Sequence, residues 1–109
     1  MSSIYRGTTP TYTLTFSDAN LDFGDANEIV VCIGNKSKQC LLEITGSDLT
    51  IETNKISFSL SQEQTLALPN TDLLVQVNWT YQSGTETKRA ASNQATINFM
   101  KNLKEEVMA

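Results

Sequence analysis

The chain has 109 residues and a formal charge of −4, and a chain of this length folds as one domain around a single core. Its 8 basic residues are scattered among 12 acidic ones, which argues against nucleic acid as a partner, because phosphate binding depends on clustered Lys and Arg. No apolar stretch approaches the roughly 20 residues that span a bilayer, and the N-terminal MSSIYRGTTP lacks the apolar centre of a signal peptide, so we expect a cytoplasmic chain with no membrane partner.

Strict alternation of apolar and polar residues is the strongest pattern in the sequence, and it predicts β-strands with one buried face. After an N-terminal arm at residues 1–10, the expected strands in chain order are 11–16, 28–33, 40–44, 49–52, 55–60, 73–82 and 95–99. The inward-facing side chains of the alternating strands are Tyr12, Leu14, Phe16, Ile56, Phe58, Leu60, Leu73, Val75, Val77, Trp79, Tyr81, Ala95, Ile97 and Phe99. The run from Ile29 to Ile33 is almost continuously apolar, which indicates a central strand covered on both faces.

Clusters of turn-forming residues separate these strands, among them residues 17–20 and the hairpin candidate Ser83-Gly84. About seven strands at this spacing, without a long helix, predict an all-β fold, an immunoglobulin-like antiparallel β-sandwich of about seven strands over residues 1–109. The disulfide and partner tryptophan of true immunoglobulin domains are missing, since Trp79 lies on a late strand and not between two cysteines.

One helical turn is expected at residues 61–67, within the stretch LSQEQTLAL. Ser61 and Gln64 have the spacing of a capping box, and Pro69 stops the turn. The turn carries the chain from one sheet to the other, and Leu66 and Leu68 are expected to close the end of the core. The alternative, a binding site formed by residues 62–64, stays open.

The last segment, NFMKNLKEEVMA, leaves the strand pattern. Phe99, Leu103 and Val107 recur at four-residue spacing with Met100 alongside, which favours a short amphipathic helix. Such a helix is marginal on its own, so it packs on its own domain, packs on a neighbour or frays.

The two cysteines, Cys32 and Cys40, are expected to be reduced thiols in a cytoplasm. A disulfide between them would have to span neighbouring antiparallel strands, and it stays open as an alternative. Cys32 lies in a predicted buried strand, where a cysteine serves as a small core residue. Cys40 is expected at the surface.

Patterns that carry chemistry are missing from the sequence. The chain has no histidine, which removes the commonest general base and the commonest metal ligand. Its five glycines are scattered singly, so there is no glycine-rich phosphate loop. Asp18, Asp22 and Asp25 lack the spacing and the closing glutamate of an EF-hand, and turn formation explains them. We therefore expect no catalytic residue, no cofactor, no metal and no enzymatic activity.

Three stretches of the chain, YRGTTPTYTLTF, KISFSLSQEQTLAL and LLVQVNWTYQSG, carry a resemblance. They resemble small proteins encoded among the tail and baseplate genes of phages and prophages of Firmicutes and related gut bacteria. More distantly, the chain is similar to the N-terminal β-sandwich of phage baseplate upper proteins. Those longer proteins carry further domains, whose activities the resemblance does not bring to this chain.

The resemblance implies a virion structural or assembly protein of the tail or baseplate region, made in the host cytoplasm and then incorporated in the virion. Such a protein acts through contacts with other virion proteins or with itself, and closed-ring homo-oligomers are the natural form. Residues 2–9 and 101–109 lie outside the core pattern, so the candidate protein-contact residues are Ile4, Tyr5, Arg6, Leu103 and Val107.

Two other functions remain open. A carbohydrate- or cell-surface-binding module would present an exposed platform of Trp and Tyr side chains. A phage-encoded host-interaction protein would be a stable monomer with one bacterial partner.

Overall fold

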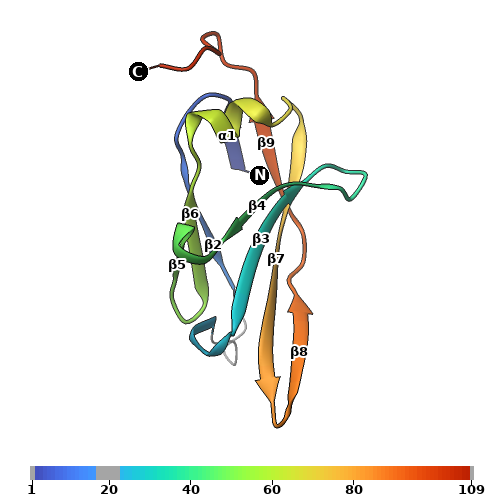
Figure 1. Cartoon of the computed structure of the whole chain (residues 1–109). Helices are drawn as coiled ribbons and strands as arrows, with labels where there is room; N and C mark the ends of the chain where they lie inside the picture. Colours follow the sequence, from blue (N-terminus) through green and yellow to red (C-terminus); the bar gives the residue numbers. More distant parts are fainter. Residues whose placement is uncertain (1, 17–22, 109) are drawn as a thin grey trace.

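The computed structural model describes residues 2–16 and 23–108, which form two sheets and one short helix (Figure 1). The strands are β1 (Ser2–Tyr5), β2 (Thr11–Thr15), β3 (Glu28–Gly34), β4 (Cys40–Thr45), β5 (Leu49–Ile51), β6 (Lys55–Ser59), β7 (Asp72–Ser83), β8 (Glu86–Ala91) and β9 (Ala95–Met100). The helix is α1 (Gln62–Ala67), and the 3₁₀ turns are η1 (Phe23–Asp25) and η2 (Gly46–Asp48).

The larger sheet has the order β1-β9-β7-β3-β4, and β8 pairs with the far part of β7. The pairing of β1 with β9 is parallel, and the other pairings are antiparallel, so this sheet is mixed, and it curls into a half-barrel. The smaller sheet is antiparallel, with the order β2-β6-β5. The prediction of a β-rich fold is confirmed, whereas an all-antiparallel arrangement of about seven strands is wrong: β1 lies parallel to β9, and β1 and β8 are strands that the alternation did not predict.

The core lies between the two sheets and follows the predicted alternation on β6 and on the first part of β7. Of the other residues predicted to face inward, Tyr12, Leu14 and Phe16 are only half-buried, and Ala95 is exposed. Most of the core's fully buried side chains come from β3, β6, β7 and β9, and they include Val31, Ile33, Ile56, Leu73, Val75, Val77, Ile97 and Phe99. On β7 the prediction fails toward the end of the strand, where Trp79 is half-buried and Tyr81 is exposed. This part of β7 extends beyond the two-layered body and forms a projecting hairpin with β8 (Figure 1). The predicted turn is there, with Gly84 at a φ of 65°.

Helix α1 lies where the sequence predicts it, between β6 of the smaller sheet and β7 of the larger one. The Ser61 hydroxyl accepts from the Gln64 backbone N–H at 3.1 Å, and the Gln64 side chain accepts from the Ser61 N–H at 2.9 Å, which completes the capping box. Leu68 is buried as expected, but Leu66 is only half-buried, and the polar Thr65 is fully enclosed.

Other sequence-based expectations are wrong. The N-terminal arm is not outside the core, because residues 2–5 form β1 and Ile4 is buried. No helix forms in the described part of the C-terminal segment, residues 101–108; its polar side chains bind other parts of the protein, and a helix this short gains too little to form alone. Strand β3 is central, between β4 and β7, but only one of its faces is buried. The predicted turn at 17–20 lies outside the described residues.

Candidate functional site

One end of the molecule joins the two terminal segments to α1, and we call residues 5–8, α1 and residues 101–108 the terminal cap (Figure 1). Its central side chain is Arg6. The guanidinium donates to the carbonyl oxygens of Leu66 at 2.7 Å and Leu68 at 2.8 Å, and it forms an ion pair with Glu105 at 2.8 Å. Carbonyl groups at the end of a helix lack intrahelical partners, so Arg6 satisfies them and ties the C-terminal segment to the helix.

Thr65 connects the chain that follows β1 to α1. Its buried hydroxyl accepts from the Gly7 N–H at 2.9 Å and donates to the Thr8 carbonyl oxygen at 2.9 Å. Gly7 adopts a φ of 83°, which favours glycine, and a Cβ there would lie 3.2 Å from the Leu66 side chain. The cap is therefore a specific polar structure, although the sequence pattern suggested only apolar sealing of the core.

The C-terminal segment is held by further hydrogen bonds. The Asn102 side chain donates to the Arg6 carbonyl oxygen at 3.1 Å, and the Asn102 N–H donates to Glu105 at 3.0 Å. The Gln62 amide donates to the Met108 carbonyl oxygen and accepts from the Met108 N–H, both at 2.8 Å. Gln62 thus binds a segment of its own chain.

Large apolar side chains are exposed on this cap. Leu103 is fully exposed, and Tyr5, Val107 and Met108 each expose more than half of their surface. Of the five predicted contact residues, Tyr5, Leu103 and Val107 are therefore free to meet a partner. Ile4 is 6% exposed and belongs to the core, while Arg6 is half-buried and engaged within its own chain.

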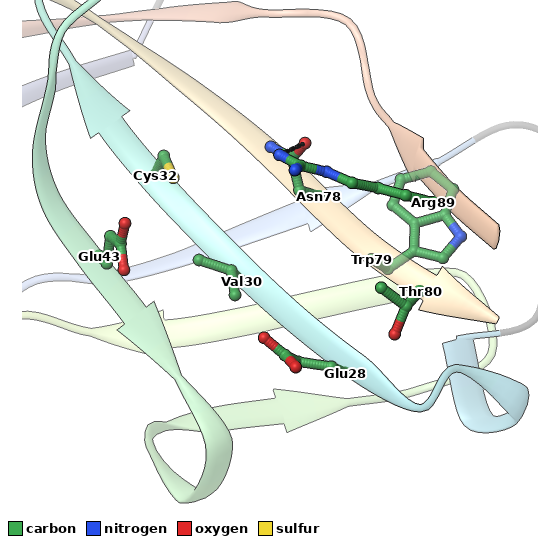
Figure 2. Close-up of a pocket in the computed structure, with 8 residues that line it drawn as sticks. All are labelled: Glu28, Val30, Cys32, Glu43, Asn78, Trp79, Thr80 and Arg89. Carbon is green, nitrogen blue, oxygen red and sulfur yellow. Dashed lines mark hydrogen bonds between the residues drawn. The ribbon is translucent and has the colours of Figure 1, made fainter. Parts of the chain in front are cut away.

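A second feature is a shallow hollow of about 300 Å³ on the outer face of the larger sheet, opposite the core (Figure 2). It is lined by Glu28, Val30, Cys32, Glu43, Asn78, Trp79, Thr80 and Arg89. Arg89 donates to the Asn78 side-chain oxygen at 3.0 Å, across the pair of strands β7 and β8. The hollow therefore combines two carboxylates, one guanidinium and one thiol on the outer face of the sheet.

The Cys32 thiol lies half-buried in this hollow, and the two cysteines are free. Burial, together with the neighbouring Cys40 and Glu43, raises the pKa of Cys32 to about 12, against a lowering by Arg89. At neutral pH the thiol is therefore protonated, whereas a nucleophilic cysteine reacts as the thiolate. Cys40 is exposed as expected, and its Sγ lies 3.4 Å from the Leu42 carbonyl oxygen, to which it donates.

Glu43 joins the two cysteines, and sequence reasoning missed this group. One ligand atom from each of Cys32, Cys40 and Glu43 lies within 4.8 Å of the others. The sequence places Cys40 and Glu43 three positions apart in one strand, where regular alternation would direct them to opposite faces. Only the observed strand register brings the three together.

The structure also places the other residues singled out by the sequence. Asp18 and Asp22 lie outside the described residues, as does the side chain of Asp25. Trp79 packs edge-on against Phe23 with ring centroids 5.1 Å apart. Within the described ranges, no helix has the length and apolar character to cross a membrane.

Tyr12 packs against Phe58 with ring centroids 5.8 Å apart, and its side chain lies against the core on the inner face of the smaller sheet. Tyr5 and Tyr81 are the two exposed tyrosines, one at the terminal cap and the other on the hairpin of β7 and β8. They lie on different features and form no common platform.

Compared with known proteins, the chain matches no family model and no curated protein.

Proposed function

We propose that this protein is a non-enzymatic structural or assembly protein of a phage or prophage virion, in the tail or baseplate region, and that it works through protein-protein contacts at the terminal cap. The resemblance of three sequence stretches supplies the biological setting. The observation that carries the contact surface is the exposure of Leu103 on a segment that hydrogen bonds hold in place. Large apolar side chains that are exposed to solvent on an ordered segment are typical of surfaces that another protein covers.

We also propose that the architecture is immunoglobulin-like, and the strand order supports this. Strands β3, β7 and β9 lie side by side as the C, F and G strands do in immunoglobulin domains, and β2, β6 and β5 follow the order of B, E and D. The α1 turn then joins the equivalents of strands E and F. Two features depart from that pattern: β1 pairs in parallel with β9, and the β8 strand is inserted between the F and G equivalents.

Open sheet edges support an assembly role as well. The edge strands of the larger sheet are β1 and β4. Strand β8 pairs only with β7, so the other edge of β8 has no strand partner among the described residues. An unpaired edge offers a row of backbone donors and acceptors to a neighbouring chain. The residues of β8 are exposed apart from Ala90, which is half-buried. The extents of 52 × 30 × 22 Å describe an elongated subunit that can reach neighbours at both ends.

The experiment is light scattering on a size-exclusion column, over a range of protein concentrations, alone and after co-expression with the proteins encoded beside it. The test variant is Leu103→Ser combined with Val107→Ser. Its matched control is Leu41→Ser, which removes an exposed leucine from β4, away from the cap.

We expect a defined oligomer or a co-eluting complex that the double variant loses and the control retains. A chain that stays a 12.0 kDa monomer and binds none of the neighbouring proteins contradicts the proposed function. An assembly that the double variant leaves intact contradicts the cap as the contact surface.

A further inference from the structure

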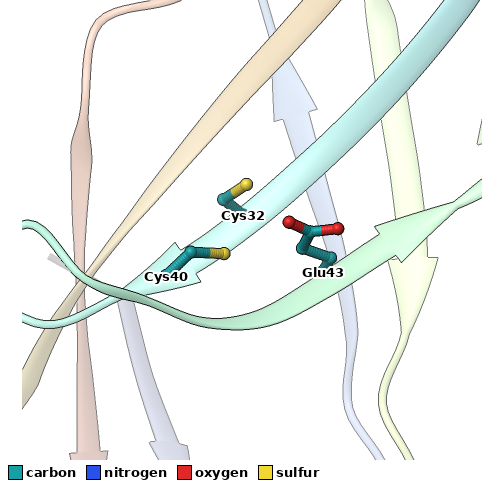
Figure 3. Close-up of side chains that lie close together, drawn as sticks. All are labelled: Cys32, Cys40 and Glu43. Atoms are coloured by element: carbon teal, nitrogen blue, oxygen red, sulfur yellow. The ribbon is translucent and has the colours of Figure 1, made fainter.

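The group formed by Cys32, Cys40 and Glu43 lies on the outer face of the larger sheet, where β3 and β4 run side by side (Figure 3). Cys32 comes from β3, and the other two come from β4. All three side chains gather on one side of the two strands, with the two sulfur atoms and the carboxylate within 4.8 Å of one another. Nothing in the terminal cap depends on them, so this group is independent of the proposed contact surface.

An irregularity in strand pairing creates the group. In the pairing of β3 with β4, Cys32 lies opposite Glu43, Ile33 opposite Leu42, and Gly34 opposite Cys40. The register therefore shifts by one residue and leaves Leu41 unpaired, as in a β-bulge. The extra residue reverses the alternation, so Cys40 and Glu43 point to the same face.

The backbone around the bulge fixes this arrangement. A Cβ on Gly34 would lie 2.6 Å from the Gln39 carbonyl oxygen, so the close approach of the strands requires glycine. The turn that follows is closed by the Asn35 side chain, whose oxygen accepts from the Gln39 N–H at 3.0 Å. Cys40 thus begins β4 directly after a well-defined turn, so the backbone fixes its position facing Cys32.

The three donor groups are available for a ligand. Glu43 forms no hydrogen bond or ion pair with any residue that the structure describes. The Cys40 thiol makes a weak bond to the Leu42 carbonyl oxygen and shares a side-chain hydrogen bond with Cys32, and both end when the thiols lose their protons. No disulfide joins the two cysteines.

Space for an ion and a further ligand lies beside the sulfur atoms. A hollow of about 130 Å³ adjoins Cys32 and Cys40. Most of its other lining residues carry amide side chains, Asn35, Gln39, Gln76, Asn78 and Gln94, and the rest are Gly34, Lys38 and Leu74. A single water needs only about 10–15 Å³ of such volume and two or more polar partners, so this hollow can hold a water bound to a metal.

We propose that Cys32, Cys40 and Glu43 bind one thiophilic divalent cation of the Zn²⁺ type, with the fourth coordination position facing the amide-lined hollow. Zn²⁺ binds thiolate sulfur at about 2.3 Å and carboxylate oxygen at about 2.0–2.2 Å, so tetrahedral ligands lie roughly 3.5–3.8 Å apart. Donor atoms within 4.8 Å reach that spacing by side-chain rotation. Each thiol releases one proton to solvent as it becomes a ligand.

The donor set also determines which metals fit. Thiolates select Zn²⁺ and related soft ions, whereas Mg²⁺ and Ca²⁺ require mostly oxygen ligands. The site crosses from β3 to the edge strand β4, so a bound ion links the two strands through side chains. Metal binding is therefore expected to stabilise the folded chain and its β4 edge.

The probe is Co²⁺, titrated into the full chain under a phosphine reductant and without oxygen. Tetrahedral Co²⁺ absorbs visible light, and thiolate ligation adds charge-transfer absorption in the near ultraviolet. The variants are Cys32→Ser, Cys40→Ser and Glu43→Gln, with Glu86→Gln as the matched control on the exposed strand β8. Circular dichroism of each variant confirms folding, and thermal unfolding with and without Zn²⁺ gives a second readout.

We expect one Co²⁺ per chain with both absorption features, displacement by Zn²⁺, and a higher melting temperature with Zn²⁺. Each serine variant should weaken binding by at least about 100-fold and Glu43→Gln by about tenfold, while Glu86→Gln leaves it unchanged. Any of three results overturns the proposal: no thiolate absorption, one ion shared by two chains, or binding that survives both serine variants. A chain that stays monomeric, binds none of the proteins encoded beside it and still binds Co²⁺ in this way contradicts the assembly role but leaves the metal site standing.

Discussion

Replacing Thr65 with valine tests whether the terminal cap depends on its buried hydroxyl. Valine has the shape of threonine but lacks the oxygen, so the Gly7 N–H and the Thr8 carbonyl oxygen lose a partner that now lies 2.9 Å from each. An unsatisfied polar group costs about 1–3 kcal/mol when buried. Because both backbone groups are only partly enclosed, we take about 1 kcal/mol for each, and Thr65→Val should destabilise the protein by about 2 kcal/mol.

The control is Thr65→Ser, which retains the hydroxyl and removes one buried methyl group. Its expected loss is about 1 kcal/mol, as for other deletions of a single buried methyl. Urea unfolding measures both changes, and in thermal unfolding the valine variant should melt roughly 8 °C lower than the wild type, at about 4 °C per kcal/mol for a chain of this size.

Hydrogen exchange separates the two causes of destabilisation. The Gly7 amide should stay protected in the serine variant and exchange much faster in the valine variant, because only valine removes its acceptor. If Thr65→Val is as stable as Thr65→Ser and its Gly7 amide stays protected, the hydroxyl does not hold the cap together.

Two further predictions concern Arg6 and Cys32. Arg6→Met should lower the free energy of unfolding, measured in urea, by about 2–3 kcal/mol, because two carbonyl groups at the end of the helix lose a charged donor. Glu105→Gln should lower it by less than about 1 kcal/mol, as is usual for partly exposed ion pairs. Equal losses in the two variants would show that the ion pair dominates. Because the pKa of Cys32 is raised to about 12 from an ordinary 9.0, its alkylation rate should rise about tenfold per pH unit through about pH 10. Trypsin separates the two cysteines into different peptides for mass spectrometry, and a rate for Cys32 that levels off near pH 9.0 would contradict the raised pKa.

The sequence predicted local features well where a short pattern decides the structure. The alternation in 55–60 and 73–77 placed Ile56, Phe58 and Leu73 correctly in the core, because a strand with one dry face requires that period. The capping box of α1 was predictable for the same reason, since its partners lie three residues apart. Tyr81 was misplaced because alternation continues along β7 after the strand has left the body of the protein.

The terminal cap depends on contacts between distant parts of the chain. Arg6 meets Glu105 across nearly the whole sequence, and β1 pairs with β9, so neither terminal segment reveals its role alone. The predicted C-terminal helix does not form for the same reason, because the segment gains more from polar contacts with Arg6 and Gln62 than from isolated helical turns.

The sequence by itself determined a β-rich chain with a defined core alternation, a capped helical turn between two sheets, and two cysteines without a histidine. Tertiary structure alone decided that Leu103 is exposed on a fixed segment, and that a one-residue register shift directs Cys40 toward Cys32 and Glu43. The physical reason is that side-chain period is a local property of the backbone, whereas strand register, and therefore which side chains share a face, is set by pairing between strands.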